Sequence, residues 1–431
     1  MKKDSIHNYL AKYAIDISDI DYLPPPAAEL KMVIVIPALA ERYNLPEVLS
    51  SLKYNKRLAE AEVIVVVNNS SAAVPEIIEN NLATLEDIKK YRNNPLKIYS
   101  VDKASLRKSL NPAEIGVGLV RRIGMDLALS RLYSNNRQLS GVIACLDADS
   151  PVAPGYIDNT LKKFFSVNPP LGAICDYEHT WDSEPELVSA INIYELWLRY
   201  FELGLKLSGS LFAVPTIGSC LIVSALGYAL ARGMPVRKAG EDFHFLRNLI
   251  KVSGYQPLLR LKEAKVFPKA RISSRVLFGT GRAMQRCVEE GLENYFMVAS
   301  PEIFFELKLF FKTITENFNK NKIYSSEFSP VFKKFLEHEQ AWKIISRLKN
   351  NYTQKSKFQL ALQHWFDSLR IVRYVNFHAK LKGKVEISNA LKKILENLDQ
   401  ADSVNLLPAL NFKQLNLQAV LTWLKYLRNF E

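Results

Sequence analysis

The stretch Gly141-Val-Ile-Ala-Cys-Leu-Asp-Ala-Asp-Ser-Pro151 decides the fold that the sequence predicts. Its apolar half, Val142–Leu146, has the length and composition of a buried strand in a parallel sheet. Asp147 and Asp149 follow at once, so they lie at the carboxyl end of that strand, where open α/β sheets carry their chemistry. Two hard oxygen ligands beside a diphosphate suit Mg²⁺ or Mn²⁺. The pattern therefore predicts a metal–diphosphate site, and the alternative is that both carboxylates cap the following helix.

Strand and helix patterns alternate on both sides of this stretch. The expected strands cover residues 32–36, 63–67, 96–101, 142–146 and 171–177, and the expected helices cover residues 46–57, 75–91, 117–133 and 156–165. This alternation predicts a three-layer α/β/α sandwich with a mixed, mostly parallel sheet. We expect residues 1–30 to form an N-terminal arm and residues 31–300 to form the catalytic domain.

Residues 301–431 differ in composition from the rest of the chain. Their apolar residues recur with helical spacing, which predicts an all-helical C-terminal extension. The formal net charge of the chain is +13, and this segment alone holds 21 Lys and Arg against 12 Asp and Glu. A basic surface can contact an anionic bilayer, nucleic acid or a phosphorylated substrate, or it can simply be solvated.

Composition and termini limit the class of protein further. Hydrophobic residues make up 48% of the 431, as in a large globular protein. The basic start Met1-Lys-Lys precedes no apolar run, so we expect no secretory signal and a cytoplasmic location. The longest apolar candidate, Gly218–Ala231, falls short of the roughly 18 residues that span a bilayer. Membrane contact is therefore expected to be peripheral, at the inner face.

Other strand ends and helix starts offer polar groups for the same crevice. Pro37 and Glu41 follow the first expected strand, and Asn69 follows the second. Arg121 lies in a glycine-containing helix start and could reach phosphate, although a helix-surface Arg is the simpler interpretation. Turn formation and helix capping are equally good interpretations of the Asn and Ser residues.

Two later motifs extend this set. Gly240-Glu241-Asp242 opens a helix, where acidic residues usually complement the helix dipole but can also act as a general base. Arg271 and Arg275 flank a short basic loop that could close over a diphosphate, and a solvated surface turn is the alternative.

In order and spacing, these motifs resemble family 2 glycosyltransferases of the GT-A fold over residues 31–285 or so. The resemblance rests on five landmarks, which are Pro37…Glu41, Asn68-Asn69-Ser70-Ser71, Gly116–Gly124, Asp147-Ala-Asp149 and Gly240-Glu241-Asp242. It implies an enzyme of the hexosyltransferase type that moves a sugar from a nucleoside-diphospho-sugar to the hydroxyl of a glycan or lipid-linked acceptor. It also implies a divalent metal, Mn²⁺ or Mg²⁺, and inversion by a single displacement.

The resemblance assigns a role to each motif. Asp242 would be the general base, with Glu241 orienting the acceptor. The donor would contact Pro37, Glu41, Asn69, Arg121, Asp147, Arg271 and Arg275. Asp147 and Asp149 would hold the metal, and we expect His244 as a third ligand. The family usually has Asp at Asn68 and Asn69, and Asn at Arg122, so the nucleotide stays undefined.

Three rival interpretations remain. A retaining GT-A transferase would use the same fold. A nucleotidyltransferase needs a glycine-rich loop just after the first strand, and Pro37-Ala-Leu-Ala-Glu41 contains no glycine. A non-catalytic, basic membrane- or glycan-binding protein could also retain this scaffold. We expect no nucleic-acid partner.

Overall fold

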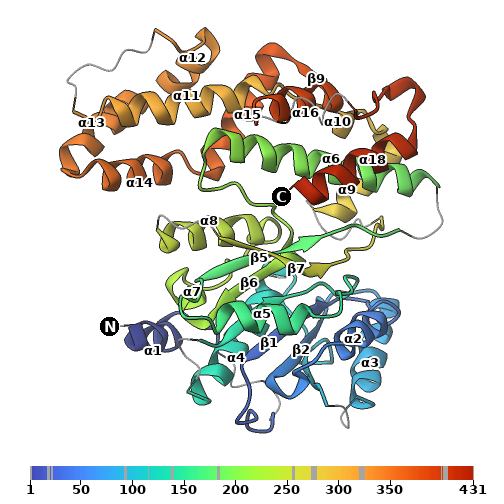
Figure 1. Ribbon diagram of the computed structural model, residues 1–431. Helices are drawn as coiled ribbons and strands as arrows, with labels where there is room; N and C mark the ends of the chain where they lie inside the picture. Colours follow the sequence, from blue (N-terminus) through green and yellow to red (C-terminus); the bar gives the residue numbers. More distant parts are fainter. Residues whose placement is uncertain are drawn as a thin grey trace. The chain divides into compact units, whose positions relative to one another are not determined.

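The computed structural model describes residues 2–16, 20, 23–91, 95–114, 116–136, 140–181, 185–254, 258–272, 279–319, 326–398, 400 and 406–430. These residues form two compact units (Figure 1). The first contains residues 1–182, 216–253 and 258–282, and the second contains residues 183–215, 254–257 and 283–431. We call them the sheet unit and the helical unit.

The sheet unit is built on one seven-stranded sheet in the order β3-β2-β1-β4-β6-β5-β7. Its strands are β1 Met32–Ala38, β2 Ala61–Asn68, β3 Lys97–Lys103, β4 Val142–Cys145, β5 Gly172–Tyr177, β6 Leu221–Ser224 and β7 Leu259–Val266. Strand β6 runs antiparallel to β4 and β5, and the other neighbours are parallel. The predicted mixed, mostly parallel sheet is therefore confirmed. The carboxyl ends of the other six strands and the start of β6 share one edge.

Helices flank this sheet (Figure 1). They are α1 Lys2–Lys12, α2 Leu45–Lys53, α3 Pro75–Lys89, α4 Val117–Ser134, α5 Tyr156–Phe164, α7 Ala225–Leu230 and α8 Glu241–Ser253, with short 3-10 turns at Leu58–Glu60 and Gly218–Cys220. Helix α4 packs on β1, β2 and β4. Gly124 permits this packing, because a Cβ there would lie 2.3 Å from a methyl group of Val35. The expected arm at residues 1–30 contributes α1, which packs on α7 and α4.

The helical unit contains α6 Pro185–Ser208, α10 Glu293–Phe296, α11 Glu302–Glu316, α12 Pro330–His338, α13 Ala341–Asn351, α14 Lys355–Trp365, α15 Ser368–Lys382, α16 Ile387–Glu396 and α18 Leu417–Phe430, the 3-10 turn Phe412–Gln414, and the short antiparallel pair β8 Met297–Ala299 and β9 Lys384–Glu386. The boundary between the units falls within α9 Thr280–Glu290. The expected C-terminal helices are confirmed, and residues 301–431 also contain the short strand β9. The contacts also group α6 and residues 283–300 with these residues, which differs from the expected boundary at residue 300.

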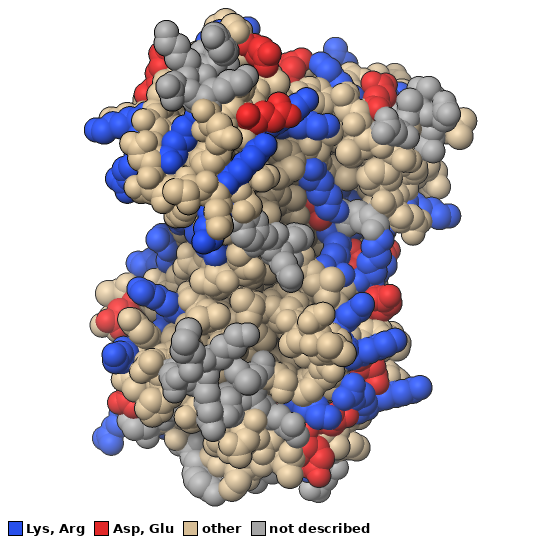
Figure 2. Space-filling view, turned by 60° about the vertical axis from the view of Figure 1, so that its left-hand side comes forward, with Lys and Arg blue, Asp and Glu red and all other residues tan. Residues whose placement is uncertain are grey.

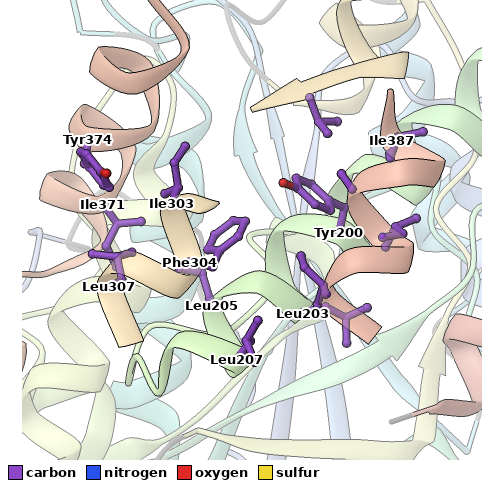
Figure 3. Close-up of a cluster of buried hydrophobic side chains, with 14 of the residues drawn as sticks. Tyr200, Leu203, Leu205, Leu207, Ile303, Phe304, Leu307, Ile371, Tyr374 and Ile387 are labelled. Atoms are coloured by element: carbon purple, nitrogen blue, oxygen red, sulfur yellow. The ribbon is translucent and has the colours of Figure 1, made fainter. Parts of the chain in front are cut away.

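Aromatic and aliphatic side chains fill the core of the helical unit (Figure 3). The ring of Phe304 packs on Gly204 of α6, where a Cβ would lie 2.3 Å from it. Tyr374 of α15 packs on Phe332 and Phe335 of α12 at ring-centroid distances of 4.7 and 4.9 Å. These contacts explain why α6 belongs with the C-terminal helices. Among the residues described, no helix combines the length and apolarity needed to cross a membrane.

Candidate active site

Five acidic side chains gather at the carboxyl edge of the sheet, and two arginines each bridge a pair of them. The acids are Glu41 after β1, Asp147 and Asp149 after β4, and Glu241 and Asp242 at the start of α8. Because parallel strands end at a common edge, residues far apart in sequence meet there. The structure thus brings together all five acids that the sequence predicted for the site.

Arg121 of α4 forms the inner bridge. Its Nη2 donates to Asp147 Oδ1 at 2.6 Å, and its Nη1 donates to Glu241 Oε1. Its side chain is only 5% exposed, and the charges of both carboxylates raise the pKa of the guanidinium although burial alone would lower it. We expected Arg121 to contact the donor phosphates. In the structure its guanidinium instead ties the end of β4 to the start of α8.

Glycine makes room for this arrangement. A Cβ at Gly218, in the 3-10 turn that precedes β6, would lie 2.2 Å from Arg121 Nη2. At Gly118 a Cβ would lie 2.6 Å from the carbonyl oxygens of Pro235 and Arg237. The helix start and the segment before α8 therefore approach one another as backbones, and Gly218 leaves room for the Arg121 guanidinium, which larger residues would prevent.

Arg271 forms the outer bridge. Its Nη2 and Nη1 donate to the two carboxylate oxygens of Glu41 at 2.7 and 3.1 Å, and its Nε pairs with Asp149. The backbone places it there, because Ala270 N donates to Thr180 O at 2.7 Å and Lys269 N donates to Asp149 O at 3.3 Å. Its side chain is 32% exposed, so this bridge is more open than the one at Arg121. Arg275, predicted beside it, lies outside the described residues.

Burial shifts the protonation of these acids. Asp149 is largely removed from water, and this burial raises its pKa to about 6 against the opposing charge of Arg271. Burial likewise raises the pKa of Glu241 and of Asp242, although the positive charge of Arg121 opposes this shift. A cation that entered here would stabilise the charged forms, and a proton acceptor with a raised pKa is a better base.

A second hydrogen-bonded cluster lies near the ends of β1 and β2, where donor contacts were predicted. Asn81 of α3 is fully buried, and its Nδ2 donates to Asn69 Oδ1 and Asn68 O, both at 2.9 Å. Its Oδ1 accepts from Ala40 N at 2.8 Å. Asn69 therefore already shares its amide oxygen with Asn81, and Pro37 is half-buried at the end of β1. The sequence analysis missed Asn81, although its position on the face of α3 shared with Leu85 and Ile88 was a signal.

His244 does not complete a metal site in the structure. It lies in the first turn of α8, where its ring packs edge-on against Phe243 at a centroid distance of 5.4 Å. Within the described ranges, no group of three or more His, Cys, Asp or Glu side chains is close enough to hold a metal ion. The expected trio of Asp147, Asp149 and His244 is thus not assembled, because each of the two aspartates faces an arginine.

Comparisons with solved structures return glycosyltransferases. They include residues 1–349 of TarS from S. aureus in complex with UDP-GlcNAc (14% identity, TM-score 0.38, covering 82% of this chain and 92% of that one) and the mannosyltransferase PcManGT from Pyrobaculum calidifontis in complex with GDP-Man and Mn²⁺ (14%, 0.35, 97% and 92%). Glucosyl-3-phosphoglycerate synthase from Mycobacterium tuberculosis in complex with Mn²⁺, UDP and glucosyl-3-phosphoglycerate is 15% identical, with a TM-score of 0.34 and coverage of 64% and 86%.

Against the longer TarS structure, the match covers 67% of this chain and 48% of that one. No protein-family model matches the chain, and no curated sequence matches it significantly. At these identities the likenesses do not assign roles to individual residues of this chain.

Proposed function

We propose that this protein is a glycosyltransferase that moves a sugar from a nucleoside-diphospho-sugar to an acceptor hydroxyl. One observation carries the proposal: Arg121 links Asp147 to Glu241, beside Asp242, and thereby joins the expected donor-binding strand end to an acid pair at a helix start. A transfer reaction needs these two functions side by side. The three glycosyltransferase structures described above, two of them with Mn²⁺, agree with the proposal.

The charge of the site favours a divalent cation. Five carboxylates face two guanidinium groups, so the site is too negative to accept a diphosphate without a further positive charge. Asp147, 34% exposed, and Asp149 offer the hard oxygen ligands that Mg²⁺ and Mn²⁺ prefer. We propose that these two aspartates hold the ion, and that Arg271 then turns from Asp149 towards the donor phosphates. A bound ion would stabilise the charge on the departing diphosphate.

The acid pair supplies the other half of the chemistry. Asp242 would accept the proton of the acceptor hydroxyl while that oxygen bonds to the anomeric carbon and the bond to the diphosphate oxygen breaks. Burial raises the pKa of Asp242, which makes it a stronger base than a free carboxylate. Glu241, held by Arg121, would orient the acceptor. A single displacement of this kind inverts the anomeric configuration, and a retaining transferase stays the alternative.

We further propose that the acceptor is a glycan or a lipid-linked sugar presented at the cytoplasmic face of an anionic membrane. Residues 340–366, which form α13 and α14, contain Lys343, Arg347, Lys349, Lys355 and Lys357 but neither Asp nor Glu. Figure 2 shows one face of the molecule, on which basic side chains are more widespread than acidic ones. Such a hairpin complements anionic lipid headgroups, which attract basic residues by about 1 kcal/mol each.

Thermal stabilisation by a panel of sugar nucleotides, with and without Mn²⁺, tests the donor and the metal together, because a ligand that binds the folded state raises its apparent stability. We expect one donor to stabilise the protein only with Mn²⁺ present, and transfer from that donor to be detectable. NMR of the product then reads its anomeric configuration. If no sugar nucleotide stabilises the protein, the non-catalytic binding protein becomes the better interpretation.

A further inference from the structure

The N-terminal helix α1 is bound to the sheet unit by a buried carboxylate. Asp126 of α4 accepts four hydrogen bonds: from Tyr9 Oη and Tyr228 Oη, both at 2.7 Å, from Ile15 N at 2.8 Å and from Arg122 Nε at 2.9 Å. These donors come from α1, the segment after it, α7 and α4 itself. A charged acceptor satisfied by four donors holds all these elements in one geometry.

Arg122 extends this cluster to the segment 232–240, which leads from α7 to α8. Its Nη1 donates to Met234 O at 2.8 Å and to Arg232 O at 3.2 Å, while its Nη2 donates to Tyr13 O at 2.5 Å. Gly233 has φ +71°, and a Cβ there would lie 2.0 Å from Tyr9 Oη. The segment therefore lies directly against α1, and one guanidinium joins the two.

The far end of the same segment is held by the preceding residue of α4. Arg121 pairs with Glu241, and the backbone at Gly116 lies against Lys238, where a Cβ would come within 2.6 Å of its Cα. Arg122 therefore binds the start of segment 232–240, and Arg121 binds Glu241, the residue that follows its end. The last residue of the segment before the acid pair is Gly240, with φ +71°.

We infer that Tyr9 and Arg122 are positioning residues, which hold segment 232–240 and thereby fix the Glu241–Asp242 pair. Neither residue contacts these acids directly. Helix α1 packs on α7 and α4 and contributes no strand to the seven-stranded sheet. Through Arg122, the chain just after α1 shares a donor with the connection that leads to α8. The inference about the segment stands on the contacts alone, whereas its effect on transfer rests on the proposed function.

Limited trypsin digestion tests, without any activity assay, whether segment 232–240 is held in place. Arg232, Arg237 and Lys238 are exposed trypsin sites within it. Arg122→Lys keeps the charge, but a lysine cannot reach the carbonyls of Arg232, Met234 and Tyr13 and the carboxylate of Asp126 together. We therefore expect cleavage at these three sites to become at least about tenfold faster. Tyr9→Phe, which removes one hydroxyl and keeps the volume, should accelerate it less.

Arg131→Lys is the matched control. Arg131 is a second buried arginine of α4, and it makes a two-pronged ion pair with Glu62 at 2.8 and 2.9 Å, away from the segment. This variant should lose thermal stability without faster cleavage at the three sites. Equal acceleration in Arg122→Lys and Arg131→Lys would show a general loosening of the fold and overturn the inference.

The kinetic arm measures transfer and donor binding separately. In Arg122→Lys, kcat should fall at least about tenfold while the Kd for donor changes less than about twofold, and Tyr13→Phe, which keeps the Tyr13 carbonyl, should match the wild type. If Arg122→Lys speeds cleavage of segment 232–240 but leaves kcat unchanged, Arg122 does not position the acid pair for transfer. If the wild type transfers no sugar at all, the proposed function fails, and the trypsin result still decides whether α1 holds the segment.

Discussion

The sheet unit and the helical unit bury charged side chains in different settings. The sheet unit withdraws Arg121, Asp149 and Glu241 from water at the edge of its sheet. The helical unit fills its interior mainly with rings and aliphatic chains, and its buried charges Glu195, Arg199 and Glu202 lie along α6, where Glu195 pairs with Arg199 and with Arg428 of α18. Burying a charge costs several kcal/mol unless it is well paired, and apolar residues of similar size are often as stable. The sheet unit sustains this cost at the strand ends, where the carboxylates of the proposed site meet.

Asp242→Asn tests that contrast with the largest expected effect. Loss of a general base should lower transfer by roughly 10²–10⁴-fold, while donor and Mn²⁺ still bind. Single-turnover rates and donor Kd measure the two separately. A variant that transfers at the wild-type rate would take Asp242 out of this role.

Arg121→Gln should reveal how much the fold depends on the inner bridge. The change leaves Asp147 and Glu241 without their common partner, and breaking a buried pair typically costs about 3–5 kcal/mol of unfolding free energy. Arg271→Gln, at the more open bridge, should cost less, because the Arg271 side chain is 32% exposed and water can partly replace it. Urea unfolding of both variants checks the difference, and equal losses would contradict the distinction between a sealed and an open bridge.

Asp149→Asn removes a proposed metal ligand while leaving the core volume unchanged. Even a lost outer-shell partner of a metal typically costs about 10–100-fold in affinity, so Mn²⁺-dependent donor binding should weaken at least that much. The fold should survive, because the side chain lies at a strand end. Unchanged Mn²⁺ dependence in a thermal-shift titration would overturn the metal assignment.

Charge reversal on the helical unit tests whether its basic surface binds anionic membranes. Lys355→Glu with Lys357→Glu on α14 should weaken binding to anionic vesicles by roughly 2 kcal/mol or more, since each lysine near such a surface contributes about 1 kcal/mol. Lys162→Glu with Lys163→Glu on α5 changes the net charge equally and should have a smaller effect. Vesicle sedimentation at low and high salt measures both pairs. Wild-type protein that ignores anionic vesicles at low salt would leave α13 and α14 as structural helices.

The smallest effect concerns pH. Burial raises the pKa of Asp149 to about 6, so between about pH 4 and about pH 6 the folded protein keeps a proton that the unfolded chain has released. The contribution of this group to the unfolding free energy therefore falls as pH rises through that window. Donor binding with Mn²⁺ should show the opposite trend, because it needs the carboxylate. Asp149→Asn should flatten the unfolding trend, and an unchanged slope in that variant would contradict the shift.

Several elements could be predicted from the sequence because their patterns are local. The apolar runs at β1, β2, β4 and β5 have strand length, and the predicted bounds lie within two residues of those in the structure. Strand β6 was missed: the sequence showed only the apolar run Gly218–Ala231, whereas the structure has a strand followed by the short helix α7. Short apolar runs do not distinguish strand from helix, because burial in a sheet and in a helix needs the same residues.

The acids of the site could be predicted, but their partners could not. Motif order placed Asp147, Asp149, Glu241 and Asp242 at one edge, since strand ends carry a directional signal. The choice of Arg121 and Arg271 as bridges depends on tertiary approach. It required glycine at position 218 and backbone hydrogen bonds after β7, and no local pattern reports either.

The contact between Glu41 and Arg271 spans 230 residues, which has a consequence for synthesis of the chain. At about 5–20 residues per second, a ribosome needs roughly 10–50 s to deliver the arginine after the glutamate. Until β7 emerges, β5 has β6 on one side and an open edge on the other. Exposed strand edges pair with other chains, so the unfinished sheet is vulnerable to aggregation during this interval. The outer bridge is therefore completed and that edge protected at nearly the same moment, because β7 and Arg271 lie within residues 259–271 of the nascent chain.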